Sequence, residues 1–204
     1  MKKIVLSLVV ILGLGCSVVN AQTSISGGVK ADANVSNFLL SDMDAYTSTM
    51  KVGASIGGFM KMEFGEVFAL QPELLFHYKA SKMEIGNSET DFEYWGAEIP
   101  VYALCQKQMG SGKGFIGVGP YVGFGFDAKY KDGDIDLYEK NSLTDKAALN
   151  RWDFGVGATL GYEFSSGISI NAGYKIGLID MMDEGKDNAS MKNQAVSLGL
   201  GYRF

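Results

Sequence analysis

The sequence predicts an all-β fold, an eight-stranded antiparallel up-and-down β-barrel that spans a membrane. Three observations predict it. Apolar and polar residues alternate strictly near the carboxyl terminus, where serine and glycine separate Val196, Leu198 and Leu200. The same alternation recurs in earlier segments, and a period of two residues is typical of a β-strand with one apolar face. Short turns rich in glycine and serine alternate with longer polar links between these segments.

The chain begins with the features of a signal peptide. Two lysines precede an apolar run of 12 residues, Ile4–Gly15, which is too short for a membrane-spanning helix. Val19-Asn20-Ala21 places small residues at the −3 and −1 positions of a cleavage site. We therefore expect residues 1–21 to be a signal peptide and residues 22–204 to form one mature domain. Cleavage before Cys16, as in a lipoprotein, is the alternative interpretation.

The composition of the mature chain narrows the classes of partner. Without the two amino-terminal lysines it has 16 basic and 23 acidic residues, a net charge of −7. An acidic chain without a Lys/Arg cluster excludes nucleic acid as a partner. Only Cys105 remains after cleavage, so no internal disulfide can form. In the full sequence, glycine occurs 27 times and proline 3 times, which fits a tightly curved sheet rather than a disordered chain.

The alternation defines the strands and their connections. It is clearest where Trp152, Phe154 and Val156 alternate with charged or small residues. Eight strands are predicted, at about residues 24–34, 51–64, 67–79, 91–106, 114–128, 150–164, 168–180 and 193–204. The long polar links are residues 35–50, 80–90, 129–149 and 181–192.

The remaining three connections are short. Gly65-Glu66, Lys107–Lys113 and Ser165–Gly167 are rich in turn-forming residues. An even number of strands, with short turns at one end and long loops at the other, is the layout of bacterial outer-membrane barrels. Residues 22–204 are therefore interpreted as an outer-membrane β-barrel, with both termini at the periplasmic end.

Strand parity predicts which side chains face lipid. The apolar set, represented by Ile99, Val156 and Leu198, is expected to contact acyl chains, because the opposite set has too much glycine and too few charges for a solvated exterior. Aromatic rings at the strand ends should mark the two membrane interfaces. The periplasmic set is Phe64, Phe68, Phe115, Tyr162, Phe164, Tyr202 and Phe204. The opposite set is Trp95, Phe126, Trp152 and Phe154.

The inward set carries nearly balanced charges. An eight-stranded barrel is just wide enough for side chains to fill it, and buried charges must pair. We therefore expect a salt-bridged plug, with an ion or proton path as the alternative. Glu73 and Glu98 are expected to share Arg203 and Lys175 as cationic partners. The predicted structural charge network of the lumen is Glu73, Glu98, Lys175, Arg203, Lys61, Arg151 and Asp153.

Several short motifs resemble those of one known family. Gln71-Pro72-Glu73-Leu74-Leu75-Phe76, Ala97-Glu98-Ile99-Pro100-Val101, Gly119-Pro120-Tyr121 and the ending Gly199-Leu200-Gly201-Tyr202-Arg203-Phe204 resemble motifs of the PorT-like, porin-family outer membrane protein beta-barrel domain of Bacteroidetes. Ala97 replaces the leucine usual in that family. The resemblance covers about residues 22–204 and implies an outer-membrane barrel whose last residues, Tyr202 and Phe204, form a membrane-insertion signal.

Catalytic and metal chemistry have little support in the sequence. His77, the only histidine, has inward parity, and no Gly-x-Ser-x-Gly motif is present. Cys105 has lipid-facing parity and reads as a small apolar residue. Asp132, Asp134 and Asp136 alternate as at the start of a calcium loop, but the glycine and the late glutamate are out of register. The sequence therefore predicts no catalytic residue, no cofactor and no metal site.

Four functions remain to be compared. The leading one is a non-enzymatic integral outer-membrane barrel with a structural or interaction role in the cell envelope, exerted through its loops or its periplasmic rim. A narrow porin-like channel for small solutes or ions is the alternative, followed by a membrane-embedded hydrolase using His77 and a soluble lipocalin-like barrel. The expected partners are outer-membrane lipid, the barrel assembly machinery and an envelope or secretion complex, with the barrel itself a monomer. The sequence names no ligand.

Overall fold

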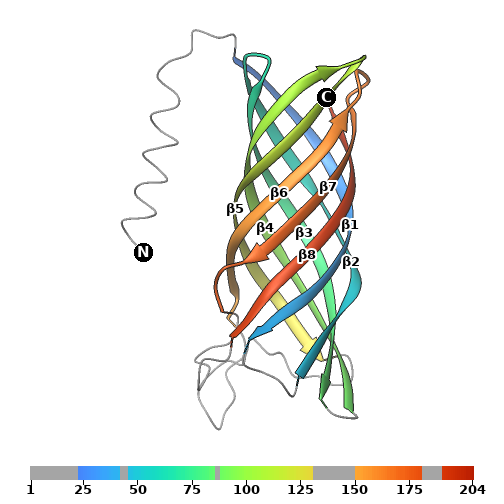
Figure 1. The fold of residues 1–204 in the computed structure, drawn as a ribbon, viewed down its shortest axis with the longest axis vertical. Helices are drawn as coiled ribbons and strands as arrows, with labels where there is room; N and C mark the ends of the chain where they lie inside the picture. The colour runs from blue at the N-terminus through green and yellow to red at the C-terminus, as the bar shows by residue number, and fades with distance from the viewer. Residues whose placement is uncertain (1–22, 42–45, 86–87, 131–149, 181–189) are drawn as a thin grey trace, which may run out of the picture.

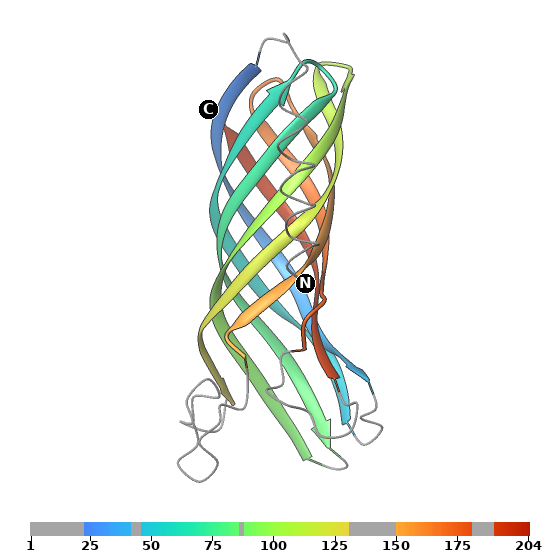
Figure 2. The same cartoon turned by 90° about the vertical axis from the view of Figure 1, so that its left-hand side faces the viewer.

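The chain forms eight long strands that close into a barrel (Figures 1 and 2). The computed structural model describes residues 23–41, 46–85, 88–130, 150–180 and 190–204. Each strand pairs antiparallel with the next, and β1 pairs with β8 to close the ring. The strands are β1 (Thr23–Ser41), β2 (Tyr46–Phe64), β3 (Phe68–Ile85), β4 (Ser88–Met109), β5 (Gly112–Tyr130), β6 (Trp152–Glu163), β7 (Ile168–Gly177) and β8 (Ser190–Arg203).

This architecture confirms the predicted fold class, the number of strands and their order. A closed barrel leaves no strand edge, so every backbone polar group in the membrane can pair within the wall. Among the described residues, no helix is long and apolar enough to cross a membrane. The predicted signal peptide, residues 1–21, lies outside the described residues, as does most of the link 129–149 with its three alternating aspartates.

Two of the predicted long links are wrong, because most of their residues are strand. β1 and β2 continue through much of residues 35–50, and β3 and β4 through most of residues 80–90. The alternation of apolar and polar residues reveals a strand only where one of its faces is apolar. Backbone hydrogen bonds between strands do not need an apolar face, so the strands continue beyond the alternation. In this region polar side chains also bond to the backbone of the neighbouring strand. Ser48 Oγ accepts a hydrogen bond of 3.0 Å from the backbone N–H of Phe38, and the side-chain amide of Asn37 donates one of 3.4 Å to the backbone carbonyl of Ser48.

The barrel carries its apolar side chains on the outside. Ile99, Val156 and Leu198 are 46%, 43% and 66% exposed, and they occupy the outward positions of β4, β6 and β8. Charged residues on the opposite parity, among them Lys61 and Glu98, are buried. A soluble barrel would show the reverse arrangement, so the predicted lipid-facing parity is what the structure shows.

Exposed aromatic rings gather near the end of the barrel away from the termini. Phe124 packs on Trp152 at 4.9 Å between ring centroids, and Trp152 on Phe154 at 6.1 Å. Phe126 and Trp95 are exposed on the same outer wall. This is the predicted girdle at that end.

One member of the predicted periplasmic girdle, Phe115, is wrongly placed. Phe115 faces the lumen, where it packs against Ala69, Tyr102 and Leu104. The Lys61 ammonium lies 5.9 Å from its ring centroid. Odd positions of β5 point inward from Lys113 to Gly125, before a bulge reverses the parity. An aromatic residue near a strand end therefore belongs to a girdle only when its parity is outward.

The two ends of the barrel differ. Three tight turns lie at one end, and each contains a glycine with positive φ: Gly65 (74°), Gly110 (62°) and Gly167 (86°). The described chain begins and ends beside these turns (Figure 1). In outer-membrane barrels the short turns are periplasmic. At the other end β6 and β7, with 12 and 10 residues, are shorter than the 18 to 22 residues of β2 to β5, so the rim is oblique.

Candidate functional site

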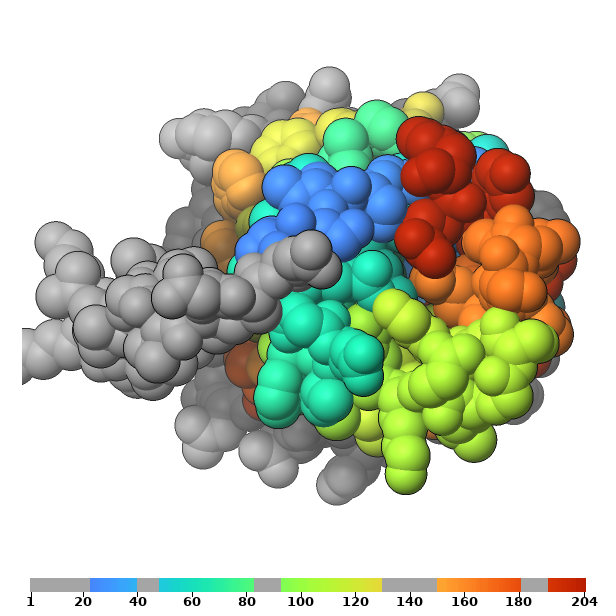
Figure 3. Space-filling view, turned by 90° about the horizontal axis from the view of Figure 1, so that it is seen from above, coloured from blue at the N-terminus to red at the C-terminus, as the bar shows by residue number. Residues whose placement is uncertain are grey.

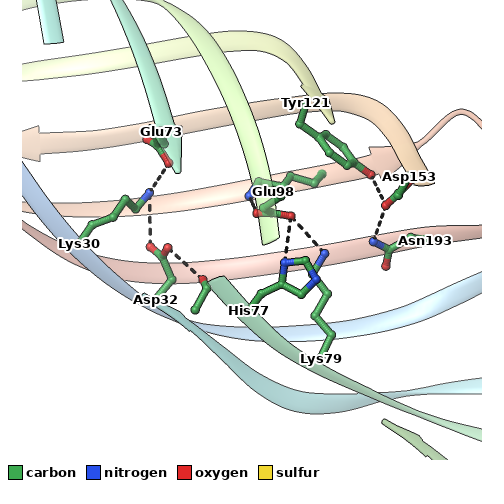
Figure 4. A network of polar contacts seen from close by, with 11 residues as sticks. Lys30, Asp32, Glu73, His77, Lys79, Glu98, Tyr121, Asp153 and Asn193 are labelled. Atoms are coloured by element: carbon green, nitrogen blue, oxygen red, sulfur yellow. Dashed lines mark hydrogen bonds and ion pairs between the residues drawn. The ribbon is translucent and has the colours of Figure 1, made fainter. Parts of the chain in front are cut away.

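The candidate site is the charged interior of the barrel. Strand parity places acidic and basic side chains from every strand in the lumen, and most of them are buried. Figure 4 shows part of this arrangement. We call it the lumen charge network and define it as Lys30, Asp32, Lys61, Glu63, Glu73, His77, Lys79, Glu98, Lys113, Asp153, Glu163, Lys175 and Arg203.

Glu98 on β4 forms the central group of the network. The Lys79 ammonium, from neighbouring β3, lies 3.3 Å from Glu98 Oε2, and Lys175 of β7 crosses the lumen to contact Oε1. His77 Nδ1 lies 3.8 Å from Oε2, and its ring meets the Tyr94 ring edge-on at 5.6 Å. Glu98 is 3% exposed, so its charge is neutralised by side chains rather than by bulk water.

A second group links β1, β2 and β3 around Lys30. Its ammonium lies 3.1 Å from Glu73 Oε2 and 3.5 Å from Asp32 Oδ1 (Figure 4). The free oxygens are held by neutral donors: the Gln71 amide donates to Glu73 at 2.8 Å, and the Ser55 hydroxyl donates to Asp32 at 3.3 Å. One cation in the lumen, Lys30, therefore pairs with two carboxylates.

A third group lies toward the periplasmic turns. Arg203 Nε donates a hydrogen bond of 2.9 Å to Glu163 Oε1, and Arg203 Nη2 forms an ion pair with the same oxygen at 2.8 Å. Lys61 lies 3.0 Å from the other oxygen of Glu163. Glu63 accepts hydrogen bonds from Lys113 and the Gln106 amide, each at 2.7 Å. Three cations thus meet two carboxylates at this end.

Asp153, near the opposite end, is held by neutral groups. The Tyr121 hydroxyl and the Asn193 amide each donate to Asp153 Oδ2 at 3.0 Å (Figure 4). Arg151, a predicted member of the network, donates to the backbone carbonyls of Gly125 and Phe126, at 3.4 and 3.1 Å, and lines one cavity together with Asp153.

The structure corrects one expected pairing. Lys175 contacts Glu98, but Arg203 pairs with Glu163 and not with Glu73 or Glu98. Arg203 shares a backbone rung with Gly28, and that rung continues through Phe59 to Glu73. Strand tilt displaces such a rung along the barrel axis, so residues three strands apart on one rung do not face each other.

Several network residues were missed by sequence reasoning. Lys79 shares the parity of Glu73 and His77, a signal that the sequence contained. Lys113 was assigned to a turn and therefore received no parity. Tyr121 and Asn193, which lie outside the network as defined but donate to its member Asp153, are neutral, so only their inward positions could have indicated them.

Little free space remains between these side chains. Three small cavities in the lumen, lined by described residues, measure about 20, 20 and 10 Å³. Each is large enough for one or two water molecules and for no larger solute. Lys79 and Glu98 line both the middle cavity and the one toward the oblique rim, and Lys30 lines both the middle cavity and the one toward the turns. The side chains of the network therefore separate neighbouring cavities.

Comparison with known proteins agrees with this geometry. The family model of the outer membrane protein beta-barrel domain matches residues 8–204. The crystal structure of Neisserial surface protein A is similar with a TM-score of 0.50 and 17% identity, over 89% of this chain and 99% of that chain. OprG from Pseudomonas aeruginosa is similar with a TM-score of 0.53 and 11% identity, over 90% of this chain and 98% of that chain. No curated protein matches the sequence. At such identities the two structures bear on the fold alone.

Proposed function

This chain belongs to the outer membrane protein beta-barrel domain family, and on that basis we propose that it is a non-enzymatic barrel with a plugged lumen and an interaction role in the cell envelope. The family and the fold make it an integral eight-stranded protein of the outer membrane. The proposal adds that its partners bind the long-strand rim or the periplasmic turns rather than pass through the barrel.

The lumen charge network is the observation that carries this proposal. Glu73, Glu98 and Glu163 each lie within 3.3 Å of at least one cation, and their side chains are at most 6% exposed. Opening a continuous path would separate buried charges, and breaking a buried pair costs about 3–5 kcal/mol. Such a lumen supports a plug that stabilises the barrel.

Electrical recording in planar bilayers tests the plug. The purified protein should insert, shown by a folded band that shifts on boiling in gel electrophoresis, and yet give no single-channel steps. Reproducible steps from the heat-modifiable protein would refute the plugged lumen. A protein that neither pellets with membranes nor shifts on boiling would contradict the integral barrel itself.

A narrow channel for small solutes or ions is the second candidate. The observation that favours it is the shared lining of the three cavities, which follow one another along the lumen. Under this alternative the unmodified barrel conducts, and substitution of Glu98 changes the ion selectivity. Under the plug it does not conduct at all.

The non-enzymatic part of the proposal is supported by the surroundings of His77. This histidine is 5% exposed and contacts Glu98 and Tyr94 inside the lumen. A membrane hydrolase would need it beside a nucleophile at a cleft that lipid can enter. We propose that His77 is a packing residue of the plug, held by its ring contact with Tyr94 and its proximity to Glu98.

We further propose the finer assignments that the motifs suggest. We propose that the chain is one of the PorT-like proteins of Bacteroidetes, because its strand motifs around Glu73 and Glu98 resemble those of that family. Residues 1–21 are proposed to be a signal peptide. The barrel is proposed to be a monomer inserted by the barrel assembly machinery, with Tyr202 and Phe204 as the insertion signal, and an envelope or secretion complex is its proposed partner. Amino-terminal sequencing of the mature protein tests the cleavage after Ala21.

A further inference from the structure

A large hollow lies at the periplasmic mouth of the barrel, outside the lumen. It measures about 490 Å³, within the range of about 300–1,000 Å³ of small-ligand sites. Its wall is formed where the turn between β2 and β3 meets the turn between β4 and β5, which lie side by side in teal and light green in Figure 3. The lining residues are Glu66, Val67, Gln106, Lys107, Gln108 and Lys113.

Gln106 gives this hollow an unused hydrogen-bond acceptor. The side chain is 1% exposed, and its amide nitrogen donates to Glu63 at 2.7 Å. The orientation of the amide is set by this bond, because Glu63 can only accept when ionised. Gln106 Oε1 is then buried without a partner, which is costly for a polar atom. A ligand that offers an N–H group would satisfy it.

The same hollow has a surplus of positive charge. Lys107 is exposed on its wall, and the Lys113 ammonium, which is bonded to Glu63 at 2.7 Å, keeps two further donors. Beneath it the cations Lys61, Lys113 and Arg203 face the carboxylates Glu63 and Glu163. The charges of Glu66 and Lys107 cancel, so the three cations and two carboxylates beneath leave a net charge of +1.

These two features select one ligand chemistry. An N–H donor for Gln106 and an anion for Lys107 and Lys113 are both present in the last residue of a peptide, which carries the final amide N–H and the free carboxylate. A sulfate dianion would bring the charge but no hydrogen-bond donor. Resting on the proposed role of the periplasmic rim, we propose that this hollow binds the free carboxyl terminus of a periplasmic polypeptide, with the carboxylate on Lys107 and Lys113 and the last amide on Gln106.

Fluorescence anisotropy with the folded full-length barrel in detergent tests the proposal. The probe is a fluorescein-labelled penta-alanine peptide with a free carboxylate, compared with the same peptide ending in a carboxamide. We expect the amide to bind about tenfold more weakly, or about 1.4 kcal/mol. Lys107→Gln should weaken the acid to a similar degree. Lys129→Gln, an exposed lysine at the other end of β5, should not change it.

Three results would overturn the site. Equal affinities for the acid and the amide peptide would mean that the carboxylate is not recognised. Displacement of the peptide by an equal concentration of inorganic phosphate would show a general anion-binding patch. Equal losses of affinity in Lys107→Gln and Lys129→Gln would show non-specific electrostatic attraction. Gln106→Met tests the amide contact independently, because it should weaken acid and amide by the same factor. Heat modification on gels, measured on every variant, keeps the outcome separate from the proposed function: a folded barrel that binds no peptide refutes only the site.

Discussion

Replacement of Glu98 by glutamine should destabilise the barrel far more than the loss of an equally short ion pair on its surface. Glu98→Gln preserves shape and removes the charge that lies 3.3 Å from Lys79 and contacts Lys175. These lysine side chains are 4% and 13% exposed, so their ammonium groups cannot recover their hydration. Removing one partner of a buried pair costs about 3–5 kcal/mol, and here one substitution leaves two cations behind.

The chain contains a matched control for this experiment. Asp127 and Lys129 on β5 lie 3.2 Å apart, but their side chains are 40% and 48% exposed. Asp127→Asn should therefore cost less than about 1 kcal/mol. Adding Lys175→Met to Glu98→Gln should recover part of the loss, because one of the two unpaired ammonium groups is then removed.

Urea unfolding in lipid vesicles, followed by tryptophan fluorescence, measures these differences. Trp95 and Trp152, the two tryptophans of the chain, both lie on the outer wall, so their emission reports loss of the lipid contact. A cost for Glu98→Gln no larger than that for Asp127→Asn would refute the reasoning. It would mean that the lumen is hydrated well enough to screen its charges, and the plug would lose its basis.

Three further predictions concern other parts of the wall. Gly57→Ala should cost about 1–3 kcal/mol in the same assay, because a Cβ there overlaps the backbone of β3, whereas at Gly58 the nearest atom lies at 3.4 Å and alanine should be tolerated; equal effects would contradict the packing. Leu198→Arg, 66% exposed in a lipid-facing row, should cost about 2–4 kcal/mol in vesicles, while Ser165→Arg in a periplasmic turn should be neutral; a tolerated Leu198→Arg would argue against lipid contact. Deletion of Phe204, which is 74% exposed, should leave spontaneous folding in detergent unchanged yet reduce insertion in cells, as judged by the heat-modifiable band; loss of both would mean a packing role instead.

The sequence predicts the sides of the strands well because parity is a local property. Residues two apart share a face whatever the rest of the chain does, so Ile99 and Leu198 could be placed outside and Glu98 inside without knowledge of the neighbours. The number of strands followed from the same pattern. Phe115 shows the limit of residue type as a guide: its aromatic ring suggested an interface, and its odd position put it in the lumen.

The pairing of charges across the lumen could not be predicted in the same way. The partner of Arg203 depends on how far the ladder climbs around the barrel, which is a property of strand tilt and register in all eight strands. Lys113 and Glu63 meet because the β2–β3 turn and the β4–β5 turn lie at the same position along the barrel axis. The sequence of neither turn predicts that position. Strand ends beyond the apolar belt were missed because polar residues there occupy both faces.

The unequal strand lengths give the cell-surface end of the molecule a fixed shape. β2 to β5 extend further at this end, as a hydrogen-bonded wall, than β6 and β7 do (Figure 2). A macromolecule that docks from outside would therefore meet a tall wall of strands on the β2–β5 side and a low edge on the β6–β7 side. Because the backbone of this wall is already hydrogen-bonded, binding to it costs less conformational entropy than binding to loops of the same area.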